Sequence, residues 1–218
     1  MIYKMQIPPF PVKSFDLLTT RQAKEIFKWY TDDIPARLDQ LQKCIDADVN
    51  GTVQLTRGKD SLRPLWSWLV ANIQLQELTE SDLKESLDAV PKWLHEYIVA
   101  GKYKLTTERL SIGMDVAIYL GEVFVHEFPQ IYWGFFTKPK SRVSVNEPVL
   151  LGFENGLDMN PRRIVDTLMW QCANGKSSEG LYEAFEIWSK FVPAQPSGPV
   201  KIYAQNYLQA RLSEVNRQ

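Results

Sequence analysis

The chain has 218 residues, of which 44% are hydrophobic and 23% charged, and its formal net charge is −1 at pH 7. This composition is typical of a globular protein with a substantial core; it excludes a disordered chain, and two cysteines are too few for a disulfide scaffold. Charge is balanced in both halves, with 12 basic and 14 acidic residues in 1–100 and 13 and 12 in 101–218, which disfavours a nucleic-acid-binding protein with an overall basic excess.

Nothing in the sequence indicates export or a membrane span. The segment 1–11 is rich in proline, and its apolar run is too short for a signal peptide. No run of 18 apolar residues occurs. Cys44 and Cys172 are far apart, which suits two buried thiols in a reducing compartment. We therefore expect a cytoplasmic protein with no membrane contact.

The N-terminal half, about residues 14–100, is predicted to be helical. Thr19 and Gln22 form a capping-box pair that opens a helix, with apolar residues at helical spacing behind it. Because Pro35 removes a backbone donor, we expect a kinked pair of helices, ending at 50–51.

A short strand at 52–55 and two further helices are predicted next. The first helix follows a cap at Asp60 or Ser61, and Thr79 with Asp82 opens the second. The segment 77–96 carries six acidic and two basic side chains. A solvated acidic helix and a docking surface for a basic partner are both consistent with this pattern.

The core is expected in a helix–hairpin–helix unit at about 106–174. A helix over 108–125 is apolar around most of its circumference, which is typical of a central helix. Three small residues at steps of four on it predict a flat face that allows close backbone approach; they are Gly113, Ala117 and Gly121.

After this helix the sequence predicts a small antiparallel sheet, built from strands at 131–137 and 143–153. Asn160 caps, and Pro161 begins, a helix that ends before Asn174. C-terminal helices are predicted within about 178–215. We find no internal repeat or linker, so residues 1–218 are expected to form one α+β domain, mainly helical around the small sheet.

Polar residues on the central helix form one narrow stripe. Asp115, Tyr119, Glu122 and His126 follow one another at steps of four, three and four. One interpretation is the solvent-facing line of the helix, with Glu122 and His126 an ordinary i,i+4 pair. The other is a seam facing a cleft, where these side chains bind a ligand or partner, or move a proton.

Sequence motifs for catalysis or cofactor binding are missing. Each of the two histidines, His95 and His126, precedes a glutamate, but neither extends to a zinc-binding His-Glu-x-x-His motif. No Gly-x-Ser-x-Gly motif or phosphate-binding glycine loop occurs. We therefore expect no cofactor, no metal and no assigned catalytic residue.

A local basic patch lies at the predicted hairpin. Lys138, Lys140 and Arg142 occur in 129–146, which has no acidic residue, and Arg162 lies in the first turn of the next helix. Neighbouring aromatic residues make RNA binding one hypothesis. An edge-protecting turn beside core aromatics is the other, and we prefer it.

One stretch of about 60 residues resembles known protein families. Ala-Ile-Tyr-Leu-Gly-Glu-Val at 117–123 is followed by Tyr-Trp-Gly at 132–134 and by Asn-Pro at 160–161. This resembles bacterial families in which a helix ending in Gly-Glu-Val precedes a Trp-bearing strand, a hairpin and a proline-opened helix. Some of these are of the immunity-protein type found in toxin systems. The resemblance implies a bacterial cytosolic protein that acts by binding, and it transfers no site residues.

The sequence therefore predicts a non-enzymatic interaction protein whose partner is another protein, with neutralisation of a toxin as the most concrete form. A small-molecule-binding protein or hydrolase using Asp115, Glu122 and His126 is the alternative. A nucleic-acid partner is disfavoured. A homodimer stays open if Trp66, Trp68 and Trp188 cannot all be buried.

Overall fold

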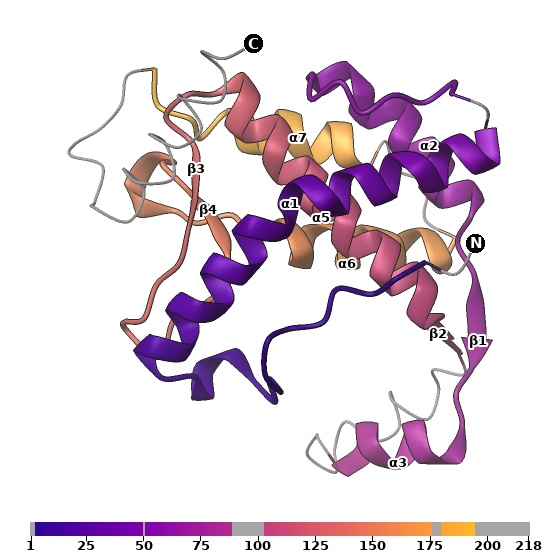
Figure 1. Cartoon of the computed structure of the whole chain (residues 1–218), viewed down its shortest axis with the longest axis horizontal. Helices are drawn as coiled ribbons and strands as arrows, with labels where there is room; N and C mark the ends of the chain where they lie inside the picture. The colour runs from indigo at the N-terminus through magenta and orange to yellow at the C-terminus, as the bar shows by residue number, and fades with distance from the viewer. Residues whose placement is uncertain (1–2, 50, 89–102, 176–179, 195–218) are drawn as a thin grey trace.

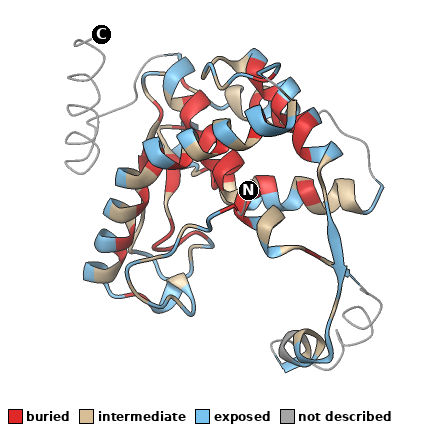
Figure 2. Ribbon diagram, turned by 45° about the vertical axis from the view of Figure 1, so that its right-hand side comes forward, coloured by how far each residue is buried: buried red, intermediate tan, exposed pale blue. Residues whose placement is uncertain are grey.

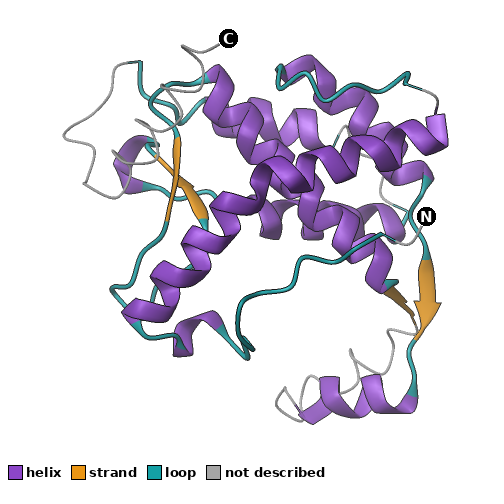
Figure 3. Cartoon of the chain, in the orientation of Figure 1, coloured by secondary structure: helices purple, strands orange, loops and turns teal. Residues whose placement is uncertain are grey.

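The computed structural model describes residues 3–49, 51–88, 103–175 and 180–194. These residues form a mainly helical structure with two small antiparallel sheets, which confirms the predicted α+β class (Figure 3). The predicted helix near the C-terminus lies outside the described residues. Within them, no helix is both long and apolar enough to cross a membrane.

Helix α5 (Thr107–Glu127) is the centre of the fold, as its apolar composition predicted. Thr106 caps it by accepting a hydrogen bond from the backbone N–H of Arg109 at 3.3 Å. Helices α1 and α6 pack against it, and its residues from Ser111 to Phe124 are buried, with the exception of Met114 (Figure 2).

Two of the small residues of α5 are closely approached, but by side chains and not by the backbone that the sequence predicted. A Cβ atom added to Gly121 would lie 2.2 Å from Cζ2 of Trp133, and one added to Gly113 would lie 2.5 Å from the sulfur of Met169. The approaching groups are large side chains from a strand and a helix.

Helix α1 (Thr20–Val49) begins at the predicted capping box, in which the Thr19 N–H donates to Gln22 Oε1 at 3.0 Å. It runs through Pro35 as one helix, so the predicted division into two helices is wrong. The helix changes direction near its middle (Figure 1). Pro35 is exposed while the buried face continues on both sides of it, so packing keeps the backbone helical.

No strand forms at 52–55, contrary to the prediction. The side chain of Gln42 donates to the carbonyl of Val53 at 3.0 Å and accepts from the N–H of Leu55 at 2.9 Å. A single amide on α1 thus satisfies the backbone groups that a neighbouring strand would otherwise bond.

The chain then forms η2 (Lys59–Ser61) and α2 (Leu62–Ala71), which pack with α7 (Leu181–Ser189). Trp66 and Trp68 on α2 are buried, and Trp188 on α7 is half-buried. The premise for a tryptophan-driven homodimer is therefore weakened.

A projecting arm consists of β1 (Leu75–Glu77), α3 (Glu80–Asp88) and β2 (Tyr103–Leu105), at the lower right of Figure 1. The two strands are antiparallel, with Leu75 opposite Leu105. The capping pair predicted for α3 is present: the Thr79 N–H donates to Asp82 at 3.0 Å, and the Asp82 N–H to Thr79 at 3.2 Å. The remainder of 77–96, residues 89–96, lies outside the described residues.

The predicted hairpin sheet is confirmed in shorter form. Strands β3 (Tyr132–Gly134) and β4 (Val149–Leu151) pair antiparallel, with Trp133 opposite Leu150. After η4 (Glu154–Gly156), helix α6 (Pro161–Ala173) begins at the predicted Asn160 cap and ends as expected.

The proline-rich N-terminal segment is extended and reaches η1 (Phe15–Leu17) just before α1 (Figure 1). It lies against α1, since the carbonyl of Lys4 accepts from Arg37 at 2.8 Å and from Gln40 at 2.9 Å. The Lys4 end of the segment is therefore held against α1.

Candidate functional site

The polar stripe of α5 faces the interior. Asp115, Tyr119 and Glu122 each have an exposed fraction of 0%, whereas His126 at the end of the helix is exposed. The solvent-facing interpretation is therefore wrong for all but His126. The reason is that partners distant in the sequence satisfy each buried polar group.

Asp115 joins the N-terminal segment and α1 to the central helix. Its two carboxylate oxygens accept from Arg37 Nε at 2.8 Å and Arg37 Nη2 at 2.7 Å, and the Tyr3 hydroxyl donates to one of them. This bidentate geometry is that of an ionised pair. Burial raises the pKa of Asp115, and the hydrogen bonds from Arg37 and Tyr3 oppose it. Burial and the carboxylate also raise the pKa of Tyr3, which stays protonated as a donor.

Tyr119 holds the loop before α2. Its hydroxyl lies 2.5 Å from the Ser61 hydroxyl and accepts from the backbone N–H of Arg57 at 2.9 Å. Arg57 has φ +63°, a left-handed conformation uncommon for residues other than glycine. The Tyr119 contact fixes the backbone at that position.

Glu122 bonds to the sheet, since it accepts from Trp133 Nε1 at 3.0 Å. Glu122 is buried and His126 exposed, so the structure does not bring them together as a reactive pair. Glu127, beside His126, accepts from the backbone N–H of Lys59 at 3.1 Å. Within the described residues, no group of three His, Cys, Asp or Glu side chains is placed to hold a metal ion.

The predicted basic residues contact several segments. Lys140 donates to the carbonyls of Asp16 at 2.9 Å and Leu18 at 3.1 Å, and Lys138 is exposed. Arg142 pairs with Asp158 at 3.1 Å.

Arg142 also lies over the ring of Phe136, 3.8 Å from its centroid. Lys140 and Arg142 therefore hold the loop in place, in addition to supplying positive charge.

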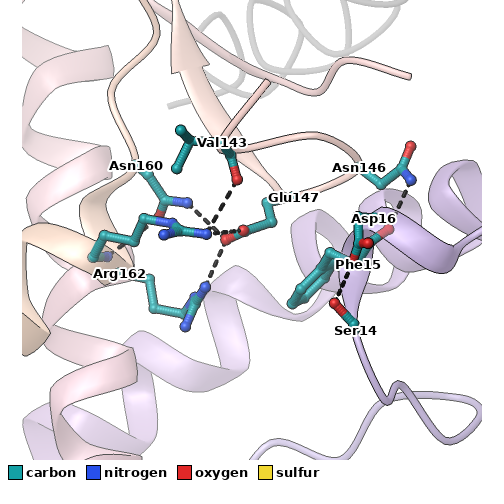
Figure 4. Close-up of polar contacts among 9 residues, drawn as sticks. Ser14, Phe15, Asp16, Val143, Asn146, Glu147, Asn160 and Arg162 are labelled. Atoms are coloured by element: carbon teal, nitrogen blue, oxygen red, sulfur yellow. Dashed lines mark hydrogen bonds and ion pairs between the residues drawn. The ribbon is translucent and has the colours of Figure 1, made fainter. Parts of the chain in front are cut away.

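Arg162 leads to a residue that the sequence analysis missed. Glu147 is 4% exposed and accepts from Asn160 at 2.8 Å, Arg162 at 2.6 Å and Arg163 at 2.6 Å (Figure 4). Burial would raise the pKa of Glu147, but the hydrogen bonds from Arg163 and Arg162 outweigh it and the net pKa is lowered. The available signal was a single carboxylate placed directly after an acid-free basic stretch and before an Arg-Arg pair.

Asn146 connects this cluster to the N-terminal segment. Its side-chain amide donates to the carbonyls of Phe15 at 2.7 Å and Leu18 at 3.1 Å, and the residue has φ +62°. Figure 4 shows the chain around Asn146 and Glu147 lying between η1 on one side and the start of α6 on the other. We call the combined surface of residues 14–18, 138–147 and 156–163 the arginine face.

Two aliphatic side chains on the arginine face are strongly exposed. Leu17 is 71% exposed and Val143 is 74% exposed. The carbonyls on either side of Leu17 accept from Lys140, and that of Val143 accepts from Arg163 at 3.2 Å. These contacts bring the two exposed aliphatic residues next to cationic side chains.

Comparisons with protein-family models, with curated proteins and with solved structures found no match to this chain.

Proposed function

We propose that this protein acts by binding another protein and that the arginine face is where it binds. Neutralisation of a toxin in a bacterial cytoplasm is the most concrete form of this proposal, following the resemblance of 117–161 to families of the immunity-protein type. In this form the molecule needs no reaction chemistry of its own.

The observation that carries the proposal is the construction of the arginine face. Glu147, although nearly buried, holds two half-exposed guanidinium groups, and Asn146 and Lys140 fasten the same loop to η1. Arginine is enriched in protein interfaces, and here two arginines are held in a fixed position at the surface. Preorganisation also lowers the entropic cost of binding.

The contacts on α5 do not favour the alternative, a hydrolase or small-molecule-binding protein using the polar stripe. Asp115 and Glu122 are engaged inside the core with Arg37 and Trp133. A carboxylate in such a contact serves to position a structural element, and His126 lies apart from both.

The test is co-expression with the products of neighbouring genes, followed by size-exclusion chromatography of the purified protein. We expect a stoichiometric complex with one of them and, if that product is toxic, restored growth of the host. A chain that stays alone with every neighbouring product, and in pull-downs from its own cells, would contradict the proposal.

A further inference from the structure

The arginine face carries positive charge that its own acids do not balance. Its three segments contain five cationic and three acidic side chains, a net charge of +2. Of the acids, Glu147 lies beneath two arginines and Asp158 pairs with Arg142. Asp16 is exposed, and Asp166, one turn after Arg162 on α6, interacts electrostatically with Arg162. Counting Asp166, five cationic side chains face four acidic ones, and the excess is +1.

Glu147 holds Arg162 and Arg163 in place, but it does not use all of their hydrogen-bond donors. Their side chains are 38% and 46% exposed, and among the described residues each guanidinium donates only through Nη2. An arginine offers five N–H donors in a fixed fork, so both keep donors for a further acceptor. Glu147 has one negative charge for two guanidinium groups, and Asp166 offsets part of the charge of Arg162. The positive charge that remains is held in a defined place by the contacts to Glu147.

The position of these arginines is also unfavourable for the helix. They lie in the first turn of α6, where the helix dipole disfavours cations. Glu147 offsets this repulsion. An anionic ligand beside the pair would relieve it further.

The exposed aliphatic groups indicate which anion fits. Leu17 and Val143 can make apolar contacts with a partner that has apolar side chains next to its charged groups. Among the described residues the strongly exposed aromatic side chains are Tyr103 and Phe191, which lie in other segments. Single-stranded nucleic acid is bound largely by stacking on exposed aromatics, so this surface suits it poorly.

We propose that the arginine face binds an acidic segment of the partner protein, with carboxylates on Arg162 and Arg163 and aliphatic side chains against Val143 and Leu17. This inference rests on the proposed function and names the chemistry of the partner. Carboxylates match the guanidinium fork in geometry and in charge.

The experiment measures fluorescence anisotropy of three labelled probes: a peptide of alternating glutamate and leucine, the lysine–leucine peptide of equal length, and oligothymidylate. We expect saturable binding of the glutamate–leucine peptide alone, weakening with added salt. Val143→Asp should weaken it on the order of tenfold, because it places a like charge beside the bound carboxylates. Val143→Lys should bind more tightly than Val143→Asp.

Folding does not confound these variants, since the Val143 side chain is mostly exposed, and circular dichroism checks it. Lys190→Glu, an exposed position after α7, is the control and should bind as the wild type does. Arg162→Gln removes one of the two guanidinium groups proposed to bind carboxylates, and it should also weaken binding. Arg163 still pairs with Glu147 in this variant.

Preferential binding of oligothymidylate would overturn the inference in favour of nucleic acid. Equal binding by Val143→Asp and Val143→Lys would also overturn it. So would a dimer by light scattering that Val143→Asp dissociates, because the occupant would then be a second copy. If the complex with a neighbouring gene product forms equally with Val143→Asp, the proposed function stands and this inference fails.

Discussion

Among the described residues, the buried carboxylates of Asp115 and Glu147 are each bonded by side chains from other segments. Asp115 bonds to Arg37 and Tyr3, 78 and 112 residues away, and Glu147 bonds to two arginines about 15 residues on. Removing Arg37 or Tyr3 leaves Asp115 buried and without one of its donors, which costs more than the contact contributes. Single substitutions at these positions are therefore sensitive probes of the fold.

Replacing Glu147 by Gln should lower the free energy of unfolding by about 1–3 kcal/mol at pH 7, because the two arginines lose their shared carboxylate. The pKa of Glu147 is lowered in the folded state, so its contribution is present above the unfolded pKa near 4.5 and is lost as pH falls through the folded value. Urea unfolding between pH 7 and pH 3 should show a shallower acid loss in the variant. Glu154→Gln, at an exposed position, is the control; an identical slope for Glu147→Gln and wild type would contradict this role.

Tyr3→Phe should cost about 1–3 kcal/mol, because Asp115 loses the hydroxyl that donates to it within the core. Limited proteolysis should also cut the segment 3–14 faster, since one of its attachments is gone. Tyr132→Phe is a matched control: burial raises the pKa of the Tyr132 hydroxyl, with no contribution from a hydrogen bond. Equal stability of the Tyr3 and Tyr132 variants would show that the hydroxyl of Tyr3 does not secure the segment.

Among the secondary-structure elements, α5 contacts a different neighbour at each of its two glycines. Gly121 lets Trp133 of β3 approach, and Glu122 in the next position bonds to that same indole. Gly113 lets Met169 of α6 approach. The two glycines thus serve different neighbours, one rigid and one flexible.

Gly121→Ala should therefore destabilise the protein by about 1–3 kcal/mol, as overpacked core positions do. Trp133 cannot withdraw without losing its hydrogen bond to Glu122. Gly113→Ala should be close to neutral, because the unbranched Met169 can adjust and alanine is the better helix former. Thermal unfolding of the pair tests this ordering; a larger loss for Gly113→Ala would contradict it.

A salt bridge between Lys104 and Asp82 joins β2 to the start of α3 within the projecting arm. Hydrogen bonds from Lys104 on β2, and then from Thr79, lower the pKa of Asp82 to about 2. An NMR titration of the side-chain carboxyl should give a midpoint near that value. Lys104→Met should move the midpoint towards the ordinary aspartate range, and an unchanged midpoint would show that the strand and the helix start are not joined in this way.

For the molecule as a whole, local patterns predicted the elements that depend on local causes. The central helix, the sheet after it and the Asn160 cap are confirmed, because each follows from hydrophobic period or cap chemistry. The strand predicted at 52–55 was wrong, because the side chain of Gln42 on α1 forms hydrogen bonds with the backbone of this segment. The strands β1 and β2 were missed because most of their residues are exposed or half-buried and form no apolar run, unlike those of β3 and β4.

The candidate site was harder to predict for the same physical reason. The spacing of Asp115, Tyr119 and Glu122 showed one stripe correctly, but it could not show whether partners would cover it. Glu147 carried no motif, and its importance arises only when the fold brings Arg162 and Arg163 against it. Long-range pairing of this kind is not a property of any short stretch of sequence.

Hydrogen–deuterium exchange of the complex with its partner locates the binding surface, because it reports where binding protects the backbone. We predict new protection centred on 14–18, 138–147 and 156–163, with exchange in β1 and α3 unchanged. Protection centred on the projecting arm, with the arginine face exchanging as in the free protein, would contradict the assignment of the binding surface.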